Sequence, residues 1–257
     1  MARLQDFQTV TPTSSDKLLV VQSQGQGLVP YGSKLDSANP TGTGKLSMNR
    51  ASGSTEGTNS IALGTNSTAS GSRAFTTGQN TVASGDYTRA SGYGCTASGL
   101  ISSAEGQGTI ANHLCQHAFG RYNIADTSTA GATALGNYIE IVGKGSTDGT
   151  RSNARTLDWA GNETIAGTLT QSSDARLKDV SEEELPDVSD IKAIKFKWKE
   201  DAGRDETEHI GYLAQDVEKV LPYLVKEDAE GNKVLDYIAF LVAKVDSLEK
   251  RLAELEK

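Results

Sequence analysis

The sequence contains few cysteines, prolines and aromatic residues and no long apolar run. Its 2 Cys exclude a disulfide framework and are typical of synthesis in a reducing compartment. No apolar run of about 18 residues occurs, so no membrane-spanning helix is predicted. Residues 1–6 lack the apolar core of a signal peptide. With 36% apolar and 6% aromatic residues, the chain has little material for one large globular core.

Positive charge is also scarce. The chain has 25 Lys+Arg against 33 Asp+Glu, and this net charge of -8 disfavours a general nucleic-acid or anionic-membrane binder. The imbalance is local, because residues 1–172 hold 11 basic and 11 acidic side chains while residues 173–257 hold 14 and 22. Of the 27 Gly, 24 precede Ser173. We therefore predict a domain boundary near residue 172.

A seven-residue repeat dominates the first part of the chain. Glycine recurs at every seventh position from Gly57 to Gly120, with His113 as the one exception, and a small residue stands two positions before the glycines. A coiled coil is excluded because its a and d positions need large apolar side chains. The period instead predicts short strands joined by tight turns, in which Ala packs inside and Gly permits positive φ. A disordered Gly/Ser linker, the alternative, does not hold such a register.

The stretch from Asn59 to Gly71, Asn-Ser-Ile-Ala-Leu-Gly-Thr-Asn-Ser-Thr-Ala-Ser-Gly, resembles the head repeats of trimeric autotransporter adhesins. The same repeat recurs in phage tail and head fibres. The resemblance covers residues 51–125 and implies a trimeric left-handed β-roll. It says little about a ligand.

The flanking regions are expected to be a shaft and an attachment segment. Residues 138–142 are a predicted strand followed by a loop over 143–149, and residues 163–170 are a further predicted strand; residues 126–172 are interpreted as a β shaft. Residues 1–50 contain one clear predicted strand, 17–22. By its position, this N-terminal region is expected to attach the protein to a virion.

The second part carries the candidate chemistry. Ser173-Asp174-Ala175-Arg176-Leu177-Lys178 is followed by His209 and the run Ile-Gly-Tyr-Leu-Ala-Gln-Asp-Val, then by Leu235-Asp236-Tyr237. This order and spacing is similar to the C-terminal intramolecular chaperone domain of phage tailspikes and endosialidases, an auto-processing serine peptidase family. The resemblance covers residues 171–257. It implies a trimer that folds, templates the β fibre before it and then cuts itself off.

The resemblance implies specific roles. Ser173 matches the nucleophile and first residue of the released domain, Lys178 matches its partner base, and the scissile bond is then Ser172–Ser173. His209 matches a polar position of the family, and either a catalytic or a packing role is open for it. An N→O acyl shift and attack from a neighbouring chain are both open as routes.

Physical chemistry sets a condition on this pair. A serine hydroxyl is a weak nucleophile that needs a base. Lysine serves as one only when neutral, and its unperturbed pKa is about 10.4. Burial favours the neutral amine, so we expect trimer assembly to switch the activity on. Taken alone, Ser, Asp and Lys in six residues also fit an ordinary surface turn in which Asp174 and Arg176 form a weak ion pair.

The remaining residues predict a small α+β unit. Strands are expected around 194–198 and 209–213, a short helix over 216–221, and a hairpin over 225–235. Asp236 is expected to cap a final helix over 237–257.

That helix carries a coiled-coil pattern. Apolar residues alternate at spacings of three and four, which places them at a and d positions; they are Ile238, Leu241, Val245, Leu248, Leu252 and Leu255. In this register, Lys244 would pair with Glu249 of a neighbouring chain, and Arg251 with Glu256. Packing of the helix on its own domain is the alternative.

His113, Cys115 and His117 alternate, so one strand face would present all three. Imidazole and thiolate suit Zn or Fe, but ordinary side chains of an irregular repeat are the preferred interpretation. No metal and no cofactor are predicted. Cys95 is expected to fill space.

Together these observations predict a mainly β homotrimeric fibre with left-handed β-roll repeats and a β shaft. A small α+β chaperone domain follows and ends in a trimeric coiled-coil helix. The expected function is a bacteriophage tail or head fibre for host adhesion or decoration that cleaves itself once. Its expected partners are its own copies, virion proteins and a host receptor, with no nucleic acid and no membrane insertion. Its expected place is the virion, after assembly in the host cytoplasm. A bacterial trimeric surface adhesin and a glycan-degrading fibre are the alternatives; for the latter, residues 51–125 offer only Glu56, Asp86 and Glu105.

Overall fold

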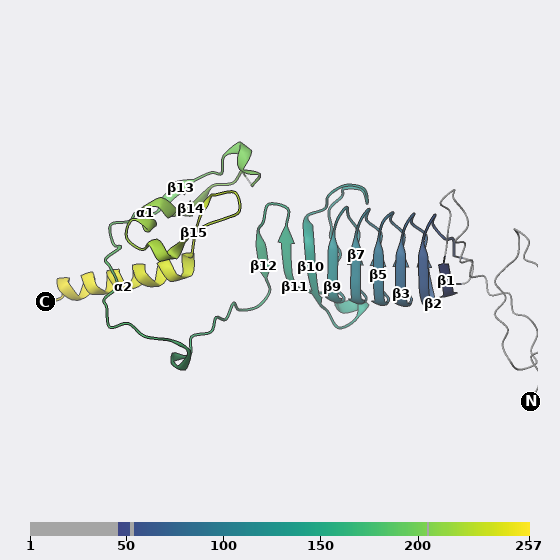
Figure 1. Ribbon diagram of the computed structural model, residues 1–257, viewed down its shortest axis with the longest axis horizontal. Coiled ribbons are helices and arrows are strands. Elements are labelled where there is room, and N and C mark those ends of the chain that lie inside the picture. The colour runs from purple at the N-terminus through teal and green to yellow at the C-terminus, as the bar shows by residue number, and fades with distance from the viewer. Residues whose placement is uncertain (1–45, 52–53, 205) are drawn as a thin grey trace, which may run out of the picture. The chain divides into compact units, whose positions relative to one another are not determined.

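The computed structural model describes residues 46–51, 54–204 and 206–257, which form two units divided between Leu169 and Thr170 (Figure 1). The predicted strand at 17–22 and most of the predicted attachment region lie outside the described residues. None of the helices described is long and apolar enough to cross a bilayer. The first unit contains β1 (Leu46–Arg50), β2 (Ile61–Ala69), β3 (Phe75–Gln79), β4 (Val82–Ala83), β5 (Arg89–Tyr93), β6 (Thr96–Ala97), β7 (Ser103–Gln107), β8 (Ile110–Ala111), β9 (His117–Arg121), β10 (Tyr138–Lys144), the 3₁₀ turn η1 (Asp148–Thr150), β11 (Asn153–Asp158) and β12 (Glu163–Ile165).

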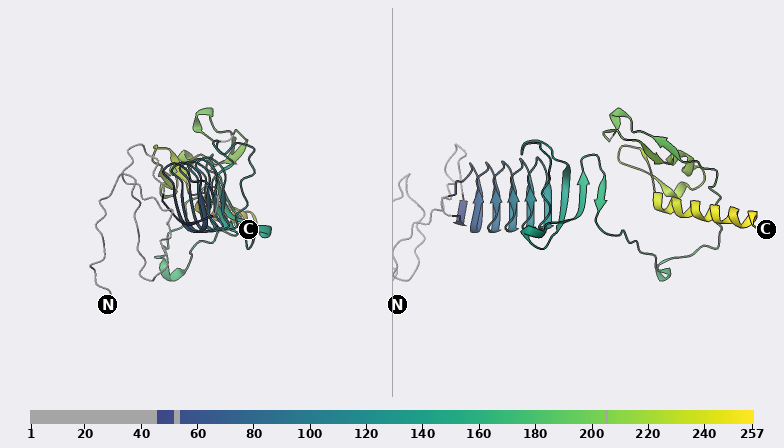
Figure 2. Two further views of the ribbon diagram at one scale, coloured as in Figure 1. Left: turned by 90° about the vertical axis from the view of Figure 1, so that its right-hand side faces the viewer. Right: turned by 180° about the vertical axis from the view of Figure 1, so that it is seen from behind.

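The first unit is a β-solenoid. β2 pairs with β3 and with β4, and so begins two stacks of parallel strands. One stack continues through β3, β5, β7 and β9, and the other through β4, β6 and β8. Each strand lies over the strand of the next coil, as in the pairing of Phe75 with Arg89 and of Val82 with Thr96. A coil therefore takes two of the seven-residue repeats, one in each stack. The left-hand view of Figure 2 looks along this stack of coils.

Alanine and glycine make the close spacing of the coils possible. The interior of the solenoid is a column of alanines, most of them fully buried, with Cys95 among them. Gly78 has φ +109, and a Cβ placed there would lie 2.0 Å from the carbonyl oxygen of Gly92 in the next coil. The repeated glycine is therefore required both by the backbone conformation and by the approach of the neighbouring backbone.

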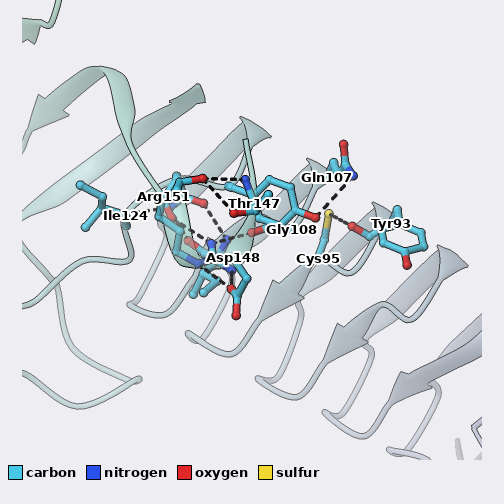
Figure 3. A network of polar contacts seen from close by, with 12 residues as sticks. Tyr93, Cys95, Gln107, Gly108, Ile124, Thr147, Asp148 and Arg151 are labelled. Atoms are coloured by element: carbon cyan, nitrogen blue, oxygen red, sulfur yellow. Dashed lines mark hydrogen bonds and ion pairs between the residues drawn. The ribbon is translucent and has the colours of Figure 1, made fainter. Parts of the chain in front are cut away.

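Side chains end the second stack of strands after β8. The buried Asn123 amide takes the place of another strand, because its Oδ1 accepts from the Ile110 N–H at 2.8 Å and its Nδ2 donates to the Ile110 carbonyl at 3.0 Å. Arg151 covers this end and donates to the carbonyls of Gly108 and Asn123 at 2.7 and 2.9 Å (Figure 3). Only the first stack continues beyond this point.

The first stack continues as three strands. β10 lies parallel to β9, and β11 and β12 then pair antiparallel. β10 runs to Lys144 and the segment after it forms η1, so the predicted loop over 143–149 is partly structured. The predicted strand over 163–170 is wrong in its extent, because β12 ends at Ile165. The Ala166 N–H still donates to the Ala154 carbonyl at 2.8 Å, and residues 166–170 are exposed.

The second unit is a small α+β domain. It contains η2 (Ala175–Leu177), β13 (Ile194–Phe196), η3 (Glu200–Ala202), β14 (His209–Gly211), α1 (Ala214–Glu218), η4 (Pro222–Leu224), β15 (Val225–Glu227), β16 (Lys233–Leu235) and α2 (Tyr237–Leu255). Its core joins Val188, Val217, Leu221, Phe240 and Ala243. Asp236 caps α2 as predicted, since its side chain accepts from the Ala239 N–H at 3.0 Å.

The fold class predicted from the sequence is thus confirmed. The described chain is mainly β, and its coils form a β-roll-like solenoid followed by an α+β unit with a long C-terminal helix. The trimer and the left-handed sense of the roll stay predictions.

Candidate active site in the Ser173–Lys178 turn

Ser173 and Lys178 meet at the two ends of one short turn. The Lys178 Nζ lies 2.7 Å from the Ser173 Oγ and donates to it. Between them, η2 reverses the chain, with hydrogen bonds from the Leu177 N–H to the Asp174 carbonyl at 3.1 Å and from the Lys178 N–H to the Ala175 carbonyl at 3.2 Å. The same contact can carry a proton in the other direction once the amine is neutral, so the pair has the geometry of a nucleophile and its base.

Asp174 and Arg176 hold this turn. The Asp174 carboxylate caps η2 by accepting from the Arg176 N–H at 2.9 Å. The Arg176 guanidinium returns to the same carboxylate, with Nε 3.1 Å from both oxygens and Nη2 2.5 Å from Oδ2. These side-chain bonds, followed by the backbone bond, lower the pKa of Asp174 below its ordinary value. The predicted ion pair between Asp174 and Arg176 is therefore present, and it involves the same carboxylate that caps η2.

The turn is open to water in one chain. Ser173 and Lys178 are both exposed, and so are the apolar neighbours Leu177 and Val180, at 77% and 75%. A single chain therefore brings the two groups together without supplying the dry surroundings that favour a neutral amine.

His209 lies elsewhere, on β14. Its ring stacks on Phe196 of β13 with centroids 5.4 Å apart and meets Trp198 at 6.2 Å. The Arg204 guanidinium covers the other aromatic group of this cluster, 4.7 Å from the Trp198 ring centre. Of the three predicted site residues, the structure therefore joins Ser173 to Lys178 and places His209 in an aromatic cluster.

The final helix packs on its domain through one side and leaves the other exposed. Phe240, Ala243 and Ser247 are its buried residues. The predicted a and d residues lie on the opposite side, because each residue turns the helix by about 100°. Their exposed fractions run from 47% at Ile238 and Leu241 to 85% at Leu255. We call these six residues, Ile238, Leu241, Val245, Leu248, Leu252 and Leu255, the a/d stripe.

The prediction that Lys244 pairs with Glu249 of another chain is wrong, because the Lys244 ammonium binds its own chain. Its Nζ donates to the carbonyls of Val188, Ser189 and Ile191 of its own chain, at 2.6, 2.8 and 2.8 Å. Burial lowers the pKa of Lys244, and the nearby charge of Lys192 lowers it further. Three short hydrogen bonds leave this ammonium no donor for a partner chain.

Ser247 completes this attachment, since its Oγ accepts from the Val188 N–H at 3.1 Å. Sequence reasoning missed the role of both polar residues. The available signal was the spacing of Phe240, Ala243 and Ser247 by three and four, which marks a second helix face that packs inward.

His113, Cys115 and His117 do not share a strand face. His113 is buried, Cys115 is exposed at a corner with φ 56, and β9 begins only at His117. The alternation argument fails because the chain turns at Cys115. In the part of the chain that the structure describes, no group of three or more His, Cys, Asp or Glu side chains is placed to hold a metal ion.

Two of the acidic residues in the repeats have structural partners. The Asp86 carboxylate accepts from the Ser72 N–H of the preceding coil at 2.8 Å. Glu105 pairs with Arg89 at 2.8 Å. Both carboxylates connect neighbouring coils, which accounts for their presence in a repeat of low charge.

The comparison with protein families supports the resemblance of the C-terminal region to a chaperone domain. Residues 173–226 match the family described as chaperone of endosialidase, so the second unit carries a C-terminal intramolecular chaperone domain. Such a domain implies self-association as a trimer of fibre type, and the family is one of self-cleaving serine peptidases. The match begins at Ser173 and ends within β15, before α2. No curated protein matches the chain.

Proposed function

Proceeding from a C-terminal chaperone-of-endosialidase domain, we propose that this chain is a trimeric bacteriophage fibre that cleaves itself between Ser172 and Ser173. The contact of 2.7 Å between the Ser173 Oγ and the Lys178 Nζ carries the proposal. In this proposal the second unit assembles three chains and assists folding of the β fibre. It then separates from residues 1–172.

The chemistry follows from the two side chains. Neutral Lys178 takes the Ser173 hydroxyl proton while Oγ bonds to a peptide carbonyl carbon. If the carbonyl is that of Ser172 in the same chain, the C–N bond breaks, the Ser173 nitrogen gains a proton, and an ester links the two parts. Water then hydrolyses the ester to the Ser172 carboxylate and the Ser173 hydroxyl. Attack on the same bond of a neighbouring chain uses the same base and gives the same products.

Trimer assembly supplies what one chain lacks. The a/d stripe offers apolar side chains at coiled-coil spacing, and α2 already uses its other side for its own domain. Association through the stripe would bring three Ser173–Lys178 turns into one assembly. Burial of the turns there would favour the neutral amine, so cleavage would follow folding.

The rest of the chain has a structural part in this proposal. The solenoid and the strands after it would form the mature fibre in the virion, for host adhesion or decoration, with residues 1–50 attaching it. The enzymatic step is the single cleavage. The aromatic contacts of His209 support a packing role for this residue.

The experiment is a denaturing gel of the full chain after assembly. Wild type is expected to give residues 1–172 and 173–257, while Ser173→Ala and Lys178→Met stay whole. Lys178→Arg tests the base specifically, because arginine keeps the charge and the donors but does not become neutral. Ser181→Ala, at another exposed serine of the same segment, is the matched control and should cleave normally. An intact wild-type trimer, or cleavage of Ser173→Ala, contradicts the proposal.

A further inference from the structure

Arg176 binds the carboxylate of Asp174, which lies in the same turn as the candidate base. Asp174 is the acidic residue within the turn, and both of its oxygens are taken by the Arg176 side chain and N–H. Lys178 meets Ser173 and, among the described residues, forms no ion pair with a carboxylate. Asp179, the next acidic residue along the chain, likewise has no ion pair in the described part.

We propose that Arg176 is a positioning residue that occupies Asp174, so that Lys178 can release its proton and act as the base. The inference rests on the self-cleavage proposed above. A carboxylate that is free within a few ångströms of an amine favours the charged ammonium. With Arg176 in place, Asp174 caps η2 and its negative charge is matched inside the turn.

The path of the proton identifies the step that a free Asp174 carboxylate would affect. Lys178 must first lose a proton to water, and then accept one from the Ser173 hydroxyl as Oγ bonds to the carbonyl carbon of Ser172. That proton is passed to the departing Ser173 nitrogen when the C–N bond breaks. A free Asp174 would oppose the first step alone, because it binds the ammonium and not the amine.

The charged surroundings of the turn are simple. Within it stand Asp174 and Arg176, and Asp179 follows Lys178 directly. Across the described residues, no hydrogen bond or ion pair joins residues 173–180 to another element of the chain. The pair of Asp174 and Arg176 is thus the electrostatic feature that the chain itself supplies to the base.

The test separates the charge of Asp174 from its capping role. Arg176→Gln frees the carboxylate. Arg176→Gln with Asp174→Asn removes the free charge but keeps an oxygen that accepts at the cap. Arg176→Lys retains a cation, and Arg204→Gln, at an exposed arginine outside the turn, is the matched control.

The measurement is single-turnover cleavage of the assembled full chain. Trimer is formed at about pH 5.5, where a general base is least effective, and is then shifted to buffers between about pH 6 and pH 10. Gels give the rate at each pH. Light scattering on the Ser173→Ala form of each variant shows whether the trimer has formed.

For Arg176→Gln we expect the pH profile to move toward alkaline pH. The rate should be about three- to tenfold lower near neutral pH and should converge with wild type at high pH. Added salt should narrow the difference. Arg176→Gln with Asp174→Asn should return the profile to the wild-type position, and Arg176→Lys and Arg204→Gln should leave it there.

Two outcomes overturn the inference while wild type still cleaves. One is that the pH profile of cleavage by Arg176→Gln coincides with that of wild type. The other is a lower rate at every pH that Asp174→Asn does not reverse, since this indicates loss of the turn rather than pairing of the base. Failure of wild type to cleave, or cleavage of Ser173→Ala, overturns the proposed function itself and this inference with it.

Discussion

The solenoid and the C-terminal unit use the same chain in opposite ways. Each coil of the solenoid satisfies its backbone and buries its alanines against the next coil of the same chain. The C-terminal unit forms a small core around Phe240 but exposes the a/d stripe along α2. A repeat can thus bury its apolar residues by stacking on its neighbours, whereas a unit that directs assembly must leave apolar surface uncovered.

The a/d stripe is where a substitution should have the largest effect on assembly. Leu241→Asp with Leu248→Asp places charges on two exposed d positions, and we expect loss of the trimer, since coiled coils exclude charge from their seam. Ala253→Asp, at an exposed position off the stripe, should leave the trimer intact. Light scattering gives the mass. A doubly substituted chain that stays trimeric would show that assembly does not depend on the stripe.

The solenoid should instead break at its glycines. Gly78→Val places a branched side chain where φ is +109 and a Cβ would lie 2.0 Å from the Gly92 carbonyl oxygen. We expect the first unit to lose more than about 3 kcal/mol of unfolding free energy, measured by urea denaturation. Gly131→Ala is the control, because a Cβ there meets nothing within 4 Å. Equal stability of the two variants would contradict the role assigned to close backbone approach.

A smaller effect is expected where α2 holds its own domain. Lys244→Met removes three hydrogen bonds to the carbonyls of Val188, Ser189 and Ile191. Because those carbonyls then lose their donor, we expect a cost of about 1–3 kcal/mol in the unfolding of the second unit. Lys250→Met, at an exposed lysine of the same helix, should cost little. Trimer mass should be unchanged in both, and a dissociated Lys244→Met trimer would restore the predicted pairing between chains.

The smallest expected effect is on acid stability. The Ser189 N–H and then the Ser189 hydroxyl bind Asp187 and lower its pKa. Because the folded pKa is the lower one, the stabilisation is present above the unfolded value near 3.9 and is lost as pH falls through the folded value. Asp187→Asn should therefore flatten the stability of the second unit below about pH 4. An unchanged slope in acid urea titrations would assign the loss to other carboxylates.

The fold could be predicted from the sequence where a pattern repeats or where a residue acts on its near neighbours in the chain. The seven-residue glycine period predicted coils, the alternation at 194–198 predicted a strand near β13, and Asp236 predicted the cap of α2. The resemblance to the chaperone family, rather than the spacing alone, implied that Ser173 and Lys178 act together, and the structure places the Lys178 Nζ 2.7 Å from the Ser173 Oγ. Each of these depends on contacts over a few residues or on one repeated unit.

Long-range contacts were beyond the sequence. The apolar spacing of α2 predicted the a/d stripe, but nothing in the helix itself shows that Lys244 reaches carbonyls more than fifty positions earlier. Likewise, Asn123 looks like an ordinary loop residue, and its use as a substitute strand depends on β8 lying beside it.

The Asn123 amide and the Arg151 side chain over it have a consequence for the length of the rod. An open row of backbone donors and acceptors is a template on which further strands can grow, within a chain or between molecules. An amide that imitates one peptide group and offers no continuing row terminates such growth. The sequence therefore sets the number of coils, and the joining of fibres end to end through the second stack of strands is disfavoured.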